Sequence, residues 1–263
     1  MNFLAIFQQE LRGYFTSSVA YIVAGVFWLI AGAYIVGMLF GEQGLIQQVA
    51  FSDRSGLIVQ PIDVAYIFLN SFFAVLGSLC LFLLPFLVIS LDPKANKRAT
   101  LELIAASPIN NWLIAVGKLL GVISFFLFII APLLLWEVII FSAAEPAIPA
   151  AVPLLAHCGL ILFAAAILSI GMCISCLTDK KVVAVILTFA VVFFIWLIDL
   201  IAQNIEGVVG NYLKHLSLIE SYNKLIQGIL ELSDVVLLLS YIFLGIFLTV
   251  QSITVLHLAR QSN

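Results

Sequence analysis

Six long apolar runs dominate this sequence, and each is long enough to cross a lipid bilayer. A helix needs about 20 mainly apolar residues to span the hydrocarbon core. Hydrophobic residues make up 64% of the 263 residues and charged residues only 10%, whereas an ordinary soluble domain has about 25% charged residues. We therefore predict an all-α integral membrane protein with a single transmembrane domain over residues 1–263. The predicted spans are Val19–Phe40, Ala65–Ser90, Trp112–Phe141, Pro153–Leu177, Val182–Ala202 and Val235–Leu258.

Lysine and arginine are unevenly distributed between the two sides of the predicted bundle. An even number of spans puts both termini on one side, and short loops rich in basic residues stay in the cytoplasm. The side that holds the termini has most of the basic residues: Arg12, Lys94, Lys97, Arg98, Lys118, Lys180, Lys181 and Arg260. The opposite side has only Arg54, Lys214 and Lys224. This asymmetry predicts that both termini are cytoplasmic.

Two segments outside the spans have amphipathic patterns. Residues 1–18 carry apolar side chains at helical spacing, namely Phe3, Leu4, Phe7, Leu11, Tyr14 and Phe15. They predict an interfacial helix, which either contacts a cytosolic partner or only anchors the chain. Residues 203–234 are too polar to span, but apolar residues recur at Leu213, Leu216, Ile219, Tyr222, Leu225, Ile226 and Ile229. We expect one or two helices that rest at the outer surface and either cap a pathway or bind an outside partner.

Residues 91–111 join the second and third spans and carry a dense group of basic side chains. On a helix, Lys97, Leu101, Ile104, Ala105 and Pro108 share one face, and Arg98 and Glu102 share another. The segment therefore predicts a short amphipathic helix joined firmly to two spans. Asn110 or Asn111 can cap the third span, as the hydroxyls of residues 16–18 can cap the first. In the simplest alternative, the loop only fixes the topology.

The same segment resembles a known protein family. R-A-T-L-E-L-I-A-A-S-P-I followed by W-L-I-A-V-G-K-L-L is similar to the loop pattern S-G-T-x-E-L-L-L-x-S-P-V and glycine-lysine pair of ABC-2 type permeases, particularly the gliding-motility and nitrous-oxide-accessory branch. Ala99 stands where that family usually has glycine. The resemblance extends over nearly the whole chain and includes Glu10–Ile22, Cys176–Lys180 and Leu218–Tyr222. The matching loop positions are Thr100, Leu101, Glu102, Leu103, Ser107, Pro108, Gly117 and Lys118.

The resemblance implies the permease subunit of an ABC transporter, an exporter in the bacterial inner (plasma) membrane. Its cytosolic coupling helix would dock on a separate ATP-binding subunit through Lys97, Arg98, Thr100, Leu101, Glu102, Leu103, Ser107, Pro108, Gly117 and Lys118. The chain has no G-x-x-x-x-G-K-[ST] motif, so we expect ATP and Mg to bind the partner and this chain to be neither an enzyme nor a cofactor carrier. A second permease, identical or related, would complete the pathway within the membrane lipid. The resemblance does not decide whether an extracytoplasmic accessory subunit is also needed. No nucleic-acid partner is expected.

Groupings typical of membrane enzymes or metal sites are not apparent in the sequence. Glu137 and Asp199 are the acids nearest the membrane interior, and both fall toward the outer ends of their spans. We expect these candidate pathway acids to reach interfacial water rather than to form a proton relay. His157 is isolated in an apolar run. The C-x-x-C at Cys173 and Cys176 has no further ligand nearby, which favours packing over metal binding.

Two other functions fit a chain of this composition. The first is a non-transporting membrane anchor or scaffold for a cell-surface complex, whose outer helices bind the partner and whose loop 91–111 tolerates substitution. The second is an ATP-independent channel or secondary transporter, for which we would expect inverted repeats or glycine-broken helices at matching positions. No convincing repeat is found, so this function ranks last. The substrate is not identified by the sequence.

Overall fold

A computed structural model describes residues 3–55, 63–88, 110–144, 147–178, 180–205 and 207–261. Within these ranges the chain forms helices and no strands. Six helices of the described part are long and apolar enough to cross a membrane, as expected of a multi-pass, all-α membrane protein. These are α2 (Ser18–Phe40), α4 (Val64–Leu87), α6 (Asn111–Ala143), α7 (Ala151–Leu177), α8 (Lys181–Asn204) and α11 (Leu232–Gln261). The shorter helices are α1 (Phe3–Thr16), α3 (Leu45–Ser55), α9 (Val208–His215) and α10 (Leu218–Ile226).

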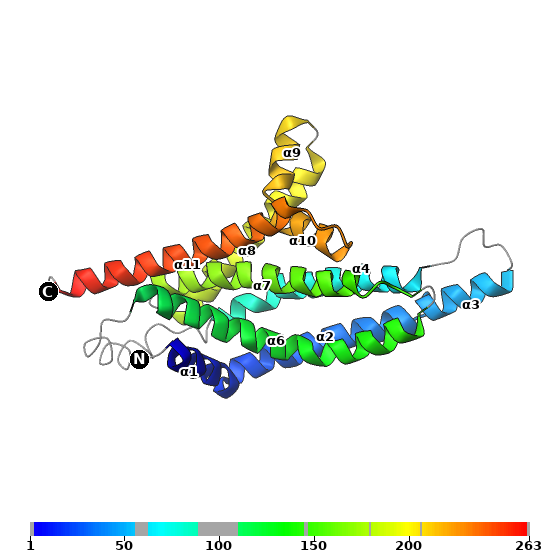
Figure 1. Ribbon diagram of the computed structural model, residues 1–263, viewed down its shortest axis with the longest axis horizontal. Helices are drawn as coiled ribbons and strands as arrows, with labels where there is room; N and C mark the ends of the chain where they lie inside the picture. Colours follow the sequence, from blue (N-terminus) through cyan, green and yellow to red (C-terminus); the bar gives the residue numbers. More distant parts are fainter. Residues whose placement is uncertain are drawn as a thin grey trace.

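The long helices run along the long axis of the molecule, and Figure 1 shows α1 and the last turns of α11 at the same end. We call this end the loop end, because α4 finishes and α6 begins there on either side of the predicted coupling loop. The opposite end, where α2 leads into α3, is called the far end. The common position of the two chain ends agrees with an even number of spans.

Local side chains set the starts of three long helices. Ser17 caps α2 by accepting a hydrogen bond from the Ala20 amide at 3.4 Å. The Asn110 side chain accepts from the Trp112 amide at 3.1 Å at the start of α6. Asp63 caps α4 in the same way. The capping predicted for the first and third spans is therefore confirmed.

The centre of the bundle is α7, which contacts α4, α6, α8, α10 and α11. Ala164, Ala165 and Ala166 lie buried along it, and such small residues allow helix backbones to approach closely. The outward surface is strongly apolar by contrast. The side chains of Leu29 and Leu154 are 71% and 70% exposed. A surface of this kind suits a lipid environment rather than water.

Within α6, Pro132 interrupts the regular hydrogen-bond ladder. The carbonyl of Ile129, one turn before this proline, accepts a hydrogen bond from the indole N–H of Trp28 at 2.6 Å. The carbonyl that lacks a helix donor because of Pro132 is that of Phe128, so this bond from α2 holds α6 one residue beyond the gap. Such support from a neighbouring helix is what makes proline tolerable in a membrane span.

The segment between α8 and α11 differs from the sequence expectation. Its two helices were expected to rest at the outer surface. Figure 1 shows α9 projecting away from the bundle, whereas α10 lies against the long helices, and α10 contacts α4, α7, α8 and α11. Periodicity indicates that a helix buries one face, but it does not identify what covers that face. How far α10 is buried in the bundle is therefore decided by its tertiary contacts and not by its sequence pattern.

Candidate functional site

Most of the predicted coupling residues lie outside the described part of the chain. This applies to Lys97, Arg98, Thr100, Leu101, Glu102, Leu103, Ser107 and Pro108. The remaining two, Gly117 and Lys118, lie in the first turns of α6 and face α1. The ammonium group of Lys118 forms an ion pair with the carboxylate of Glu10 at 3.1 Å, and both side chains are less than one-tenth exposed.

The contact between α1 and α6 is close because α6 has two glycines there. A Cβ on Gly117 would lie 2.9 Å from Ile6 Cγ2, and one on Gly121 would lie 2.9 Å from Glu10 Cβ. Further along, the fully buried Tyr14 stacks on Phe125 with ring centroids 5.6 Å apart. The helix α1 is thus held tightly against the loop end of α6.

The face of α1 that packs on α6 contains a charged residue. Its buried residues are Ile6, Glu10 and Tyr14, whereas Leu4, on the predicted apolar face, is exposed. Sequence reasoning did not place Glu10 on this face, because its partner Lys118 is distant in the sequence. Burial, and secondarily the negative charge of Glu10, raises the pKa of Tyr14 well above its usual value. The phenol is therefore neutral at physiological pH.

Nearer the far end, the buried Glu137 of α6 forms a second pair with the partly buried His157 of α7. His157 Nε2 lies 3.3 Å from Glu137 Oε2, and His157 Nδ1 lies 2.8 Å from the carbonyl oxygen of Pro153. Glu137 is only 2% exposed. The expectation that His157 is isolated was wrong, because the packing of α6 on α7 brings the acid and the imidazole together.

Helix α10 is wedged between α4 and α7 by its Tyr222 side chain. The phenol hydroxyl donates a 2.5 Å hydrogen bond to the carbonyl of Phe73, in the middle part of α4. The ring stacks on Phe163 of α7 with centroids 4.8 Å apart and planes 19° from parallel. Gly77 leaves the space for this ring, since a Cβ there would lie 2.4 Å from Tyr222 Cε1.

These contacts form one continuous set of four residues, which we call the central cluster: Tyr222, Phe73, His157 and Glu137. Phe73 links the two halves, because its ring meets the His157 ring edge-on at 4.9 Å. The central cluster thereby joins α10, α4, α7 and α6. Burial raises the pKa of Tyr222 well above its usual value, and the nearby Cys80 and Glu137 add to this effect. The Tyr222 hydroxyl therefore remains a hydrogen-bond donor.

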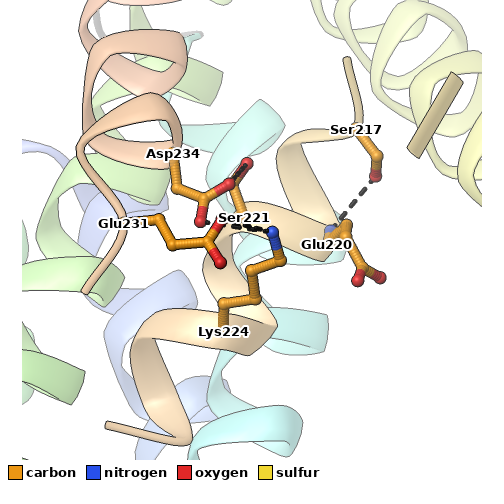
Figure 2. Close-up of polar contacts among 6 residues, drawn as sticks. All are labelled: Ser217, Glu220, Ser221, Lys224, Glu231 and Asp234. Carbon is orange, nitrogen blue, oxygen red and sulfur yellow. Dashed lines mark hydrogen bonds and ion pairs between the residues drawn. The ribbon is translucent and has the colours of Figure 1, made fainter. Parts of the chain in front are cut away.

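A polar cluster holds α10 to the start of α11, as Figure 2 shows. The Ser221 hydroxyl donates to Asp234 Oδ1 at 3.0 Å. The Lys224 ammonium lies 2.8 Å from Glu231 Oε2 and 3.5 Å from Asp234 Oδ2. Ser217 caps α10 by accepting from the Glu220 amide at 3.1 Å. Sequence reasoning did not select these residues, although they follow one another closely in the chain.

The second predicted pathway acid, Asp199, lies near the end of α8. It accepts a hydrogen bond from the Ser217 hydroxyl at the start of α10, and another from Gln203 Nε2 at 3.0 Å. Its side chain is 5% exposed. The prediction that Glu137 and Asp199 reach interfacial water is therefore not supported, because both are buried against protein groups of neighbouring helices.

Replacing Lys224 by methionine is expected to lower the melting temperature by about 2 °C near neutral pH, and this difference should vanish in acid. The hydrogen bond and the charge of Lys224 lower the pKa of Glu231. A carboxylate with a lowered pKa stabilises the fold above its ordinary pKa of about 4.3 and loses that contribution as pH falls through the lower folded value. The Glu231 hydrogen bond raises the pKa of Lys224, so the lysine contribution is lost only in strong alkali. Melting curves from acid to neutral pH test this, and a difference that stays constant would contradict it.

The described site thus contains an ion pair between α6 and α1, formed by Lys118 and Glu10, and an acid–base pair between α6 and α7, formed by Glu137 and His157. In addition, α10 is wedged between α4 and α7. Metal-ligand groupings of three or more acidic, histidine or cysteine side chains do not occur in the described ranges. Comparison with models of known protein families found no match, and comparison with curated protein sequences found no similar protein.

Proposed function

We propose that this chain is the membrane-spanning permease subunit of an ABC transporter that works as an exporter. In this proposal, a separate ATP-binding subunit closes on ATP and Mg, and its motion switches the transmembrane pathway between inward and outward access. The six membrane-length helices support the proposal, as does the resemblance of residues 91–111 and their flanks to ABC-2 type permeases.

The observation that carries the proposal is the position of α6. This helix follows the predicted coupling segment directly and bears Lys118 near the loop end and Glu137 toward the far end. Nineteen residues separate the two positions, which corresponds to about 28 Å along a helix. The ion pair with Glu10 ties its first turns to α1, and the contact with His157 ties its later turns to α7. A push on the loop would therefore be carried along α6 into the central cluster.

The expected partners follow from the same arrangement. The coupling segment would dock on the ATP-binding subunit, whereas Gly117 and Lys118 would act indirectly by holding α1 beside it. A second permease copy, or a related permease, would complete the pathway in the bacterial inner membrane. Both termini would be cytoplasmic in this orientation, with α9 and α10 toward the outer side.

ATP hydrolysis by the purified complex tests the proposal. The chain is co-expressed with a candidate ATP-binding subunit encoded beside it, and wild type is compared with Leu101→Asp and Glu102→Ala. We expect the subunit to co-purify with wild type, and Leu101→Asp to reduce its recovery or its ATPase activity about tenfold or more, because a buried charge replaces an apolar docking contact. The loop substitutions lie outside the transmembrane helices, so the chain itself should still fold.

The matched control is Leu216→Asp, which makes the same change at an exposed leucine between α9 and α10.

The projection of α9 from the bundle favours the alternative function, a membrane anchor that binds an outside partner. Under that alternative, Leu216→Asp would disturb the native complex and Leu101→Asp would not. Failure of any ATPase to associate with wild type would also count against the permease.

A further inference from the structure

An apolar groove lies between the later turns of α6 and the first turns of α7. Its volume is about 740 Å³, within the range of small-molecule sites. Leu134, Val138 and Leu154 are among the side chains that form its walls, together with Phe141 and Ile148. Glu137 and His157 also line it. The groove is thus a mostly apolar space with one acid–base pair.

The hydrogen-bond geometry requires that the empty pair hold one proton. His157 Nδ1 faces the carbonyl oxygen of Pro153, which only accepts, so Nδ1 must carry a hydrogen. The remaining nitrogen, Nε2, faces Glu137 Oε2. Without a proton between them, two lone pairs would face each other at 3.3 Å, so the contact needs a proton from either the imidazolium or the carboxylic acid. The pair is therefore neutral overall when the groove is empty.

The second carboxylate oxygen is the feature that points to a ligand. Glu137 Oε1 is buried and has no hydrogen-bond partner among the described residues. Buried carboxylate oxygens are normally satisfied by a donor, and an ionised carboxylate in apolar surroundings needs a positive charge nearby. By contrast, both oxygens of Asp199 are occupied by Ser217 and Gln203. The only other carboxylate oxygen of the described residues in this condition, Asp234 Oδ2, lies 3.5 Å from the Lys224 ammonium.

We propose that the groove binds an apolar-chain amphiphile with a protonated amine, which pairs with Glu137 in place of the proton shared with His157. The ammonium group has several N–H donors and one positive charge, so it can satisfy the free oxygen Oε1 and replace the shared proton electrostatically. The alkyl chain lies along the apolar walls. Binding of one ammonium group releases one proton, and the site stays neutral.

The exchange of the shared proton for an ammonium group is the main titration in the groove, because the neighbouring titratable groups stay neutral. From α7 the group that faces Glu137 is His157. From α10, Tyr222 is close enough for Glu137 to affect its pKa, and Cys80 of α4 lies near that tyrosine. Burial raises the pKa of Tyr222, so it stays neutral and does not compete for the proton. The inference does not rest on the proposed function, because binding to the groove needs no ATP-binding subunit.

Equilibrium binding of radiolabelled dodecylamine tests the inference. The full chain is reconstituted in phosphatidylcholine nanodiscs, and empty nanodiscs correct for partition into lipid. We expect saturable binding of one dodecylamine per chain, with an affinity that rises about tenfold per pH unit while the pair is protonated, because one proton is exchanged. Dodecanol has the same chain and no charge, so it should bind at least tenfold more weakly.

Glu137→Gln should remove the saturable binding, whereas Glu42→Gln, the same change at an exposed acid beyond α2, should leave it unchanged. Equal binding of dodecanol and dodecylamine to wild type would mean that the groove recognises only the chain, and would overturn the inference. Absence of saturable dodecylamine binding, or an affinity independent of pH, would overturn it as well. These wild-type measurements decide the matter even if Glu137→Gln does not fold.

Discussion

Lys118→Met is expected to lower the free energy of unfolding by about 3 kcal/mol, because it breaks a buried ion pair by removing one of its two charges. The two groups are 3.1 Å apart and nearly fully buried between α1 and α6. The melting temperature should fall by about 6 °C or more. Thermal unfolding followed by tryptophan fluorescence in detergent micelles measures the change, and protease sensitivity of α1 reports whether this helix has detached.

The double variant Glu10→Gln/Lys118→Met should recover most of this loss, because a buried ion pair replaced by neutral groups of similar size is often tolerated. Lys180→Met provides the matched control at an exposed lysine before α8, and its effect should be small. If the double variant were as unstable as Lys118→Met, the loss would come from packing rather than from the broken ion pair. The cycle of single and double variants separates these two causes.

The number and limits of the spans were predictable because they depend on local properties. Length and apolarity define a membrane helix regardless of its neighbours, and the caps at Ser17 and Asn110 act within three residues. The central cluster depends instead on residues that are far apart in the chain. Tyr222 reaches Phe73 across 149 positions. No periodic pattern contains information about such a partner, so its prediction needs the packing of the helices.

One missed feature did have a sequence signal. Gly117 and Gly121 form a G-x-x-x-G pattern in the third predicted span, and this pattern marks a surface where another helix can approach closely. Combined with the amphipathic pattern of residues 1–18, it could have suggested that α1 packs there. We read the lysine between these glycines as a contact for the ATP-binding subunit, but its side chain faces Glu10. The pairing of Glu137 with His157 had no comparable signal.

Tyr222→Ala is expected to have the largest effect of all, a loss of about 4 kcal/mol, because removal of a fully packed aromatic ring leaves a cavity. The ring fills the space beside Gly77 and stacks on Phe163, so its loss should release α10 from α4 and α7. Melting temperature in micelles measures the loss of stability. Trypsin measures the release, since cleavage after Lys224 becomes possible only when the buried Leu225 leaves the bundle. Tyr21→Ala, at an exposed tyrosine of α2, should change neither measurement appreciably.

Adding Gly77→Val to Tyr222→Ala distinguishes direct packing of Tyr222 against Gly77 from a general loss of stability. Alone, Gly77→Val should also destabilise the protein, because its Cβ would lie 2.4 Å from the Tyr222 ring, and overpacking of this kind costs about 1–3 kcal/mol. In Tyr222→Ala the valine would enter the empty space, so the double variant should be more stable than Tyr222→Ala. Simple addition of the two losses would contradict direct packing of these residues. Rescue would instead establish that Tyr222 of α10 packs directly against Gly77 of α4.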